Sequence, residues 1–159
     1  MNARWLIIDG YSLLHNDPAF AGVGARGMAA AREQLVTRLS SAGRTLAERI
    51  TVVFDGGGFV GQRLPQAPSP VEVLFSTSSE TADTIIERLA HSAARAGEIL
   101  VITSDRAERV TVDAAGAQSM GCTDFLSELN AAENALRRST SGLKQRGPKP
   151  TLGDFFPKP

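Results

Sequence analysis

The sequence predicts an α/β fold with a mostly parallel central sheet and helices on both of its faces. Short runs of Ile, Val, Leu and Phe alternate along the chain with longer segments of helical periodicity. This alternation is typical of strand–helix units that build a parallel sheet. Three of the runs are almost continuously apolar, which indicates strands that are buried on both faces.

Four segments are predicted as strands. In chain order they are Arg4–Ile8, Ile50–Phe54, Val71–Phe75 and Ile99–Thr103. Ala117–Met120 is a candidate for a short additional strand. Gly56–Gly58 and the Pro- and Gln-containing stretch Gln62–Pro70 predict a loop inside one domain, because Gly and Pro interrupt regular structure.

Three segments are predicted as helices from the spacing of their apolar residues. They are Gly27–Ser41, Glu80–Ala96 and, approximately, Thr123–Arg138. Gly97 is expected to end the second helix, because Gly is favoured after a helix C-terminus. The strand–helix alternation also requires a helix between the fourth strand and the candidate fifth.

The composition narrows the class of protein. The 159 residues are 42% hydrophobic, which suits one globular domain, and the formal net charge of +0 gives no whole-molecule attraction to nucleic acid or membrane. The single Cys122 excludes an internal disulfide and a Cys-rich zinc site. No apolar run approaches the roughly 20 residues of a membrane span, and no export signal is seen, so a cytoplasmic location is expected.

We expect the folded domain to span residues 1–138 and residues 139–159 to form a flexible, basic tail containing Pro, Gly and Ser. The basic residues from Arg137 to Lys149 are not balanced by an acid until Asp154. Such a tail either tethers the protein to RNA or a ribosome through salt-sensitive contacts, or only increases solubility. We favour the tether.

Acidic residues follow separate elements at one predicted edge of the sheet. Asp9 follows the first strand, Asp55 the second and Asp105 the fourth. Asp83 lies in the first turn of the helix after the third strand, and Glu80 precedes it by three residues. The carboxyl ends of parallel strands meet at one edge, so these side chains are expected to converge.

A single acid at such a position is equally explained as a turn or helix-capping residue. Four carboxylates that share a pocket, however, repel one another unless a cation neutralises them. Oxygen ligands without His or Cys select Mg²⁺ or Mn²⁺. The pattern therefore predicts metal-dependent phosphoryl chemistry.

Several neighbours of this edge are candidates for RNA contacts. Tyr11 could stack on a base, although packing beneath the following helix also explains it. Ser12 could bind a phosphate. Arg63, Arg106 and Arg109 lie in loops or at helix starts near the acids, where they could hold phosphates or simply be solvated.

Four segments together resemble the YacP-like branch of the NYN ribonucleases, within the PIN-like superfamily. They are Ile7–Leu14, Val53–Asp55, Val73–Glu87 and Val101–Asp105. The most specific feature is Phe75, four intervening residues and Glu-Thr-Ala-Asp83, joined to Thr-Ser-Asp105. The similarity covers residues 4 to 136.

The resemblance implies a PIN-like three-layer sandwich, with residues 1–138 as the nuclease domain, and RNA cleavage by metal-activated water. It implies Asp9, Asp83 and Asp105 as metal ligands, with Asp55 as a further catalytic residue and Glu80 as a further ligand. It also implies single-stranded or messenger RNA as substrate, because family members include an endoribonuclease that acts on messenger RNA at the ribosome.

One residue departs from the family pattern. The family usually has Asn after Asp-Gly-Tyr, and this chain has Ser12, whose hydroxyl reaches less far than an amide. We predict a metal-dependent endoribonuclease that uses one or two Mg²⁺ or Mn²⁺ ions. The alternative is a catalytically silent RNA- or ribosome-binding module with the same fold, for which Ser12 is the main support. A receiver-like domain is disfavoured, because no paired acids follow the first strand.

Overall fold

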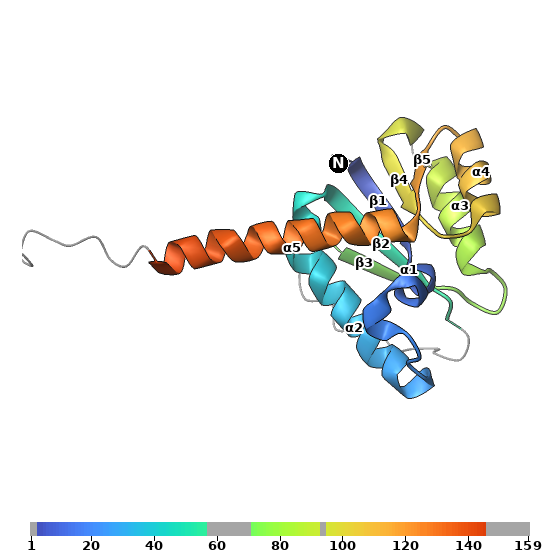
Figure 1. The fold of residues 1–159 in the computed structure, drawn as a ribbon. Helices are drawn as coiled ribbons and strands as arrows, with labels where there is room; N and C mark the ends of the chain where they lie inside the picture. The colour runs from blue at the N-terminus through green and yellow to red at the C-terminus, as the bar shows by residue number, and fades with distance from the viewer. Residues whose placement is uncertain (1–2, 57–70, 93–94, 146–159) are drawn as a thin grey trace, which may run out of the picture.

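The structure, a computed structural model, describes residues 3–56, 71–92 and 95–145 (Figure 1). Five strands form one sheet, in which every adjacent pair is parallel and the order is β3-β2-β1-β4-β5. The strands are β1 (Ala3–Asp9), β2 (Ala47–Phe54), β3 (Val71–Phe75), β4 (Ile99–Ile102) and β5 (Gln118–Met120). The predicted α/β fold is confirmed, and so is the candidate fifth strand.

The strand order reverses direction between β1 and β4. The chain moves outward from β1 through β2 to β3, and then returns to place β4 on the other side of β1. In register, Ile8 lies beside Val52 and Ile102, and all three side chains are fully buried. A reversal of this kind leaves a crevice at the carboxyl ends of the two strands, where α/β proteins bind ligands.

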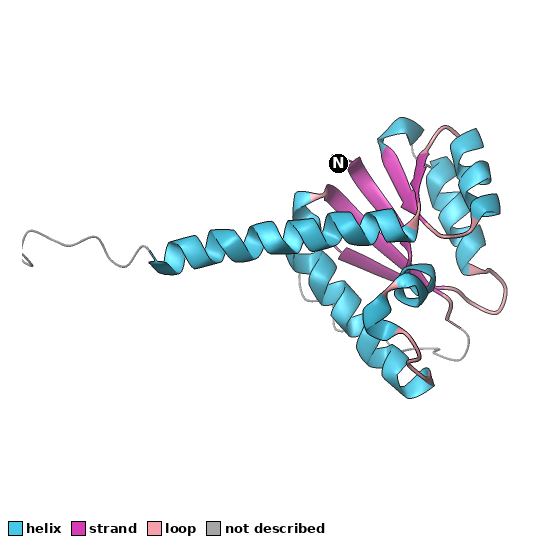
Figure 2. Cartoon of the chain, in the orientation of Figure 1, coloured by secondary structure: helices cyan, strands magenta, loops and turns pink. Residues whose placement is uncertain are grey.

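Helices cover both faces of the sheet (Figure 2). One face carries α1 (Gly10–Asn16), α2 (Ala25–Ser41) and α5 (Cys122–Gln145), and the other carries α3 (Ala82–Ser92) and α4 (Arg106–Ala114). Short 3-10 turns stand at Pro18–Phe20, Gly43–Thr45 and Ala96–Glu98. Among the described residues, no helix combines the length and the apolar character needed to cross a membrane.

The two faces have separate hydrophobic cores because the strand side chains alternate between them. Leu6 and Ile8 of β1 belong to the core beneath the first group of helices, which also contains Leu35 of α2. Ile7, between them in the sequence, packs on the opposite face with Ile86 of α3. The nearly continuous apolar runs are thus explained by burial on both sides.

The helices of the structure differ from the predicted ones at several ends. α2 begins at Ala25, two residues before the predicted Gly27. α1 was not predicted, because seven residues are too short to show helical periodicity. α3 begins at Ala82 rather than Glu80, because Thr77 and Glu80 form an isolated antiparallel bridge that holds the preceding turn. Its described part reaches Ser92, residues 93 and 94 lie outside the described residues, and residue 95, before Gly97, is not helical.

α5 continues to Gln145, past the expected end of the helix at Arg138. Residues 139–145, placed in the tail by the sequence, are therefore helical. The Thr140 hydroxyl donates to the Leu136 carbonyl at 3.0 Å, so a polar side chain of this segment bonds to the helix backbone. Residues 146–159 of the expected tail lie outside the described residues.

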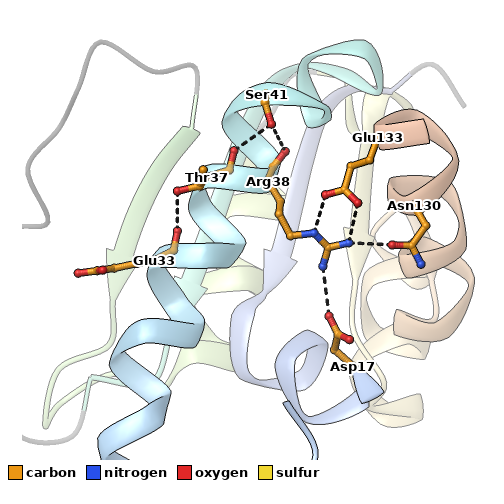
Figure 3. A network of polar contacts seen from close by, with 7 residues as sticks. All are labelled: Asp17, Glu33, Thr37, Arg38, Ser41, Asn130 and Glu133. Carbon is orange, nitrogen blue, oxygen red and sulfur yellow. Dashed lines mark hydrogen bonds and ion pairs between the residues drawn. The ribbon is translucent and has the colours of Figure 1, made fainter. Parts of the chain in front are cut away.

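A charged network joins the three helices on the first face (Figure 3). Arg38 of α2 donates from Nε to Glu133 of α5 at 2.6 Å and from Nη2 to Asn130 at 2.8 Å. Its Nη1 donates to Asp17, which caps the C-terminus of α1, at 3.2 Å. The network therefore fixes α1, which begins directly after Asp9, against the two longer helices.

Replacing Arg38 with Met should lower the free energy of unfolding by about 3 kcal/mol, because two largely buried carboxylates lose their cation. The side chains of Asp17 and Glu133 are only 11% and 18% exposed. Urea unfolding followed by circular dichroism measures the change. Arg95→Met is the control, because Arg95 pairs with Glu98 from a side chain that is 75% exposed and should leave the midpoint almost unchanged. Equal shifts for the two variants would contradict the assigned role.

Candidate active site

A cavity of about 700 Å³ opens at the carboxyl ends of the strands, beside the reversal between β1 and β4. It is lined by Asp9, Tyr11, Ser12, His15, Met28, Arg32, Asp55, Ala82, Asp83, Ser104 and Asp105. The structure thus brings together the four aspartates that the sequence placed at this edge. Tyr11 and Ser12 line the same space.

Asp9 is the last residue of β1 and the N-cap of α1. Its Oδ1 accepts a hydrogen bond from the Ser12 backbone N–H at 3.2 Å. Burial raises the pKa of Asp9, and the nearby carboxylates of Asp83 and Asp105 raise it further, while the Ser12 N–H opposes the change. Asp9 is both a capping residue and a member of a crowded acidic site.

Gly10 allows the helix to begin directly after Asp9. A Cβ at this position would overlap the ring of Phe54, which is fully buried at the end of β2. Any larger residue would push α1, which begins directly after Asp9, away from the sheet. The small residue after the first aspartate is therefore a steric requirement of the site.

Asp55 and Asp105 also make structural hydrogen bonds. The Asp105 Oδ1 caps α4 by accepting from the backbone N–H groups of Ala107 at 2.9 Å and Glu108 at 3.3 Å. Asp55 accepts from the Ser76 hydroxyl at 2.7 Å, and the same hydroxyl oxygen accepts from Gly56 N–H at 2.8 Å. Asp105 is therefore held by the helix that it caps, and Asp55 is held by the residue that follows the neighbouring strand β3.

The tightest carboxylate cluster contains a residue that the sequence analysis missed. One oxygen each from Asp9, Asp83 and Glu108 lies within 4.8 Å of the others. Glu108 projects from the first turn of α4, three residues after Asp105, and is only 3% exposed. The Asp105-x-x-Glu108 spacing, which places two acids on one helix face, is the sequence signal that could have identified it.

The surroundings of Glu108 are unfavourable for a charge. Its Oε2 accepts from the Thr103 hydroxyl at 2.7 Å, whereas its Oε1 is buried and has no hydrogen-bond partner among the described residues. Burial raises the pKa of Glu108 to about 8, with further contributions from the charges of Asp83 and Asp9. A buried carboxylate oxygen without a donor is costly unless another group neutralises it.

A divalent cation fits this cluster. Oxygen ligands at about 2.1–2.5 Å from one ion lie at most about 4–5 Å apart, which the 4.8 Å spread satisfies. The ligands are all carboxylates, which suit Mg²⁺ or Mn²⁺. The orphaned Oε1 of Glu108 supplies an independent reason, because ligation would satisfy it.

Other predicted site residues lie elsewhere. The carboxylate of Glu80 pairs with Arg88 at 2.9 Å and does not line the cavity. Arg106 is exposed at the start of α4, and Arg109 donates to the Ser119 hydroxyl at 3.3 Å; neither lines the cavity. Arg63 lies outside the described residues.

Ser12, the departure from the family pattern, connects two turns of the site. Its hydroxyl oxygen accepts from the backbone N–H of Ser104 at 2.9 Å and is hydrogen-bonded to the Ser104 hydroxyl. The buried Cys122 thiol also donates to it, at 3.6 Å. Ser12 therefore ties the turn that follows Asp9 to the turn that precedes Asp105.

Tyr11 is packed within the protein as well as lining the cavity. Its ring meets Phe54 edge-on at 5.3 Å between centroids and stacks with His15 at 6.2 Å. Its hydroxyl accepts from Arg32 Nη1 at 2.7 Å. These contacts give Tyr11 the packing role that the sequence left as an alternative to base stacking.

Comparison with known proteins agrees with this architecture. The model of the YacP-like NYN domain family matches residues 6–155. A relative in Bacillus subtilis (strain 168), the uncharacterized protein YacP, is 29% identical over 144 residues, which cover 90% of this chain and 85% of that protein. Crystal structures of Rae1 (YacP) from Bacillus subtilis are similar in fold at 28% identity. For a mutant form the TM-score is 0.75, and the match covers 91% of this chain and 85% of the Rae1 chain. For another structure the TM-score is 0.74, and the match covers 88% of this chain and 81% of the Rae1 chain.

Proposed function

Because the chain belongs to the YacP-like NYN domain family, we propose that it is a metal-dependent endoribonuclease that hydrolyses phosphodiester bonds in RNA. The observation that carries the proposal is the cluster of Asp9, Asp83 and Glu108, whose oxygens lie within 4.8 Å of one another. Two further carboxylates, of Asp55 and Asp105, line the adjoining cavity. A strongly acidic pocket attracts a polyanion only when cations are present, which accords with a metal-dependent nuclease.

In this proposal Asp9, Asp83 and Glu108 hold Mg²⁺ or Mn²⁺. Such an ion makes water a better nucleophile at neutral pH and stabilises negative charge on the phosphate. Asp105 and Asp55 are fixed by their own hydrogen bonds, and from the cavity wall they can orient the attacking water and accept its proton. Asp105 is close enough to Asp9 to raise its pKa, so it belongs to the same electrostatic site.

The proposed substrate is single-stranded or messenger RNA in the cytoplasm. Family membership supports RNA, and the resemblance of the motifs implies messenger RNA at the ribosome. The cavity of about 700 Å³ has room for a nucleotide segment. An assay on free RNA tests the chemistry independently of any ribosomal context.

The test compares purified protein with its Asp83→Asn variant on single-stranded and structured RNA. Cleavage is expected with Mn²⁺, none with a chelator, and a loss of at least about 100-fold in the variant, because one ligand is removed. Asp113→Asn is the matched control, since Asp113 is exposed on α4 and does not line the cavity. RNA binding without cleavage under any metal would instead support the silent binding module.

The main support for the alternative, a catalytically silent RNA- or ribosome-binding module, was Ser12, which stands where the family usually has Asn. In the structure Ser12 joins the turns that carry Asp9 and Asp105. The substitution removes no carboxylate from the cluster, and the shorter side chain has its own hydrogen bonds across the site. We therefore favour the enzyme.

A further inference from the structure

The acidic cavity is lined by two chemically different kinds of side chain. Besides the carboxylates, its lining includes the aromatic rings of Tyr11 and His15 on α1 and the thioether of Met28 on α2. A nucleotide also has two such parts. Its phosphate needs the cation that the carboxylates hold, whereas its base is a flat ring that packs against aromatic side chains. The lining therefore offers a place for a base beside the place for a phosphate.

Tyr11 and His15 form a stacked pair on α1. They are four residues apart, which places them on the same face of the helix. Their ring centroids are 6.2 Å apart and their planes are inclined by 22°. The half-buried Tyr11 ring also meets the fully buried ring of Phe54 edge-on, at 5.3 Å between centroids. The pair is thus supported by the core through Tyr11 and ends in the exposed ring of His15.

One face of the His15 ring is open to a ligand. Among the described residues, the imidazole makes no hydrogen bond or ion pair, and its ring contact is with Tyr11. A stacked contact of this kind uses one face of a ring. The second face of the exposed imidazole can therefore receive another flat ring without displacing any contact within the protein.

The helix that carries the pair is fixed relative to the carboxylates. Asp9 caps the first turn of α1, and Asp17, at its C-cap, accepts from Arg38 at 3.2 Å. Burial raises the pKa of Asp9, and His15 opposes this change through its charge. The imidazole is therefore within electrostatic reach of the cluster, on an element whose two ends are both held.

We propose that a nucleobase of the RNA strand stacks on the ring of His15 while a neighbouring phosphate lies at the carboxylate cluster. The assignment rests on the proposed function, because it needs RNA in this cavity. Histidine is one of the aromatic side chains on which proteins stack unpaired RNA bases. Stacking tolerates every base, since each has a flat π-face. The subsite would therefore select an unpaired strand and not a particular sequence.

The binding test uses the Asp83→Asn protein with Mn²⁺, so that the probe is not cleaved, at about pH 8, where histidine side chains ordinarily carry no charge. Two fluorescein-labelled probes are titrated, an unstructured RNA oligonucleotide and an abasic strand of the same length. Adding His15→Ala should weaken binding of the RNA about 10-fold, the order expected for loss of one stacked base. The affinity for the abasic strand and the salt slope should not change, because no phosphate contact is lost.

Two further variants separate stacking from other roles of the imidazole. His15→Phe keeps an aromatic ring and loses both ring nitrogens, so it should bind RNA within about 2-fold of the parent. His91→Ala is the matched control, since His91 is exposed in the last turn of α3 and does not line the cavity. It should leave the affinity for RNA unchanged. Melting temperatures check that each variant is folded.

Cleavage kinetics on the otherwise unaltered protein provide a second readout. His15→Ala should raise KM for single-stranded RNA about 10-fold and lower kcat less, because it removes a contact to the strand and leaves every carboxylate in place. His15→Phe should restore the KM of the unaltered protein. A purely structural role of His15 would lower the melting temperature without this split.

The outcomes separate this proposal from the proposed function. Parental affinity of His15→Ala for RNA overturns the stacking subsite, and so does an equal loss on the abasic strand or a loss that His15→Phe does not restore. If His15→Ala does not fold, parental affinity in His15→Gln overturns it. A base-dependent loss of binding, in a protein that cleaves RNA with no metal, overturns the nuclease and retains the subsite. Absence of RNA binding to the parent overturns both.

Discussion

Raising the pH from about 5 to about 8 should lower the free energy of unfolding of the metal-free protein by about 4 kcal/mol. The cause is Glu108, because burial raises its pKa from an ordinary 4.5 to about 8. Between these values the folded protein keeps the Glu108 proton, whereas the unfolded chain has lost it. The folded state then binds more protons, so stability falls as the pH rises and levels off above the folded pKa.

Asp9 changes stability in the same direction, because its pKa is also raised by burial. The charges of Asp83 and Asp105 contribute to both shifts. The effect is large beside the total stability of about 5–15 kcal/mol that is usual for a domain. Chemical denaturation at several pH values, in the presence of a chelator, measures it.

A divalent cation should oppose this loss of stability at high pH, because it stabilises the folded protein more at high pH than at low pH. Mn²⁺ binds the ionised carboxylates, so its binding releases about one proton wherever Glu108 is still protonated in the free protein. The rise in melting temperature on adding Mn²⁺ should therefore be greater at about pH 8 than at about pH 5. Calorimetry in buffers with different ionisation enthalpies counts the released protons.

Glu108→Gln is the control for both effects. The amide has nearly the shape of the protonated acid and cannot ionise, so the variant should lose the Glu108 part of the pH dependence, keep only the contribution of Asp9, and respond little to Mn²⁺. A wild-type protein whose stability is flat from about pH 5 to about pH 8 would show that Glu108 is ionised without metal. Proton release equal in the variant and the wild type would place the metal elsewhere.

The positions of the strands were predictable because burial on both faces leaves a strong signal in the sequence. The runs at β1, β2 and β4 are apolar at nearly every position, and the structure buries Leu6, Ile7 and Ile8 completely. Helix ends were less predictable, since they depend on single contacts. The start of α3 is set by the Thr77–Glu80 bridge, and the far end of α5 continues through Ser and Thr residues that often end helices.

The acidic edge was predictable for a related reason: parallel strands deliver their carboxyl ends to one place, and Asp9, Asp55 and Asp105 each follow such a strand. Two features were not predictable in this way. Glu108 lies inside a helix and not at the end of a strand. Its carboxylate lies beside those of Asp9 and Asp83 because the first turn of α4 is buried against the site. Arg32 comes from the middle of α2, whose approach to the cavity is a property of helix packing.

Variants of Glu108 and Glu80 test most directly which of the two glutamates is a metal ligand. Glu108→Gln should reduce metal-dependent RNA cleavage by at least about 100-fold, as expected for loss of a ligand, and raise the Mn²⁺ concentration needed for half-maximal activity. Glu80→Gln should leave both unchanged, because the Glu80 carboxylate is engaged by Arg88 outside the cavity. Melting temperatures of the two variants serve as the folding control. The opposite result, with activity lost in Glu80→Gln and retained in Glu108→Gln, would restore the sequence-based choice of ligand. It would also require that the buried Oε1 of Glu108 be satisfied by something other than a metal.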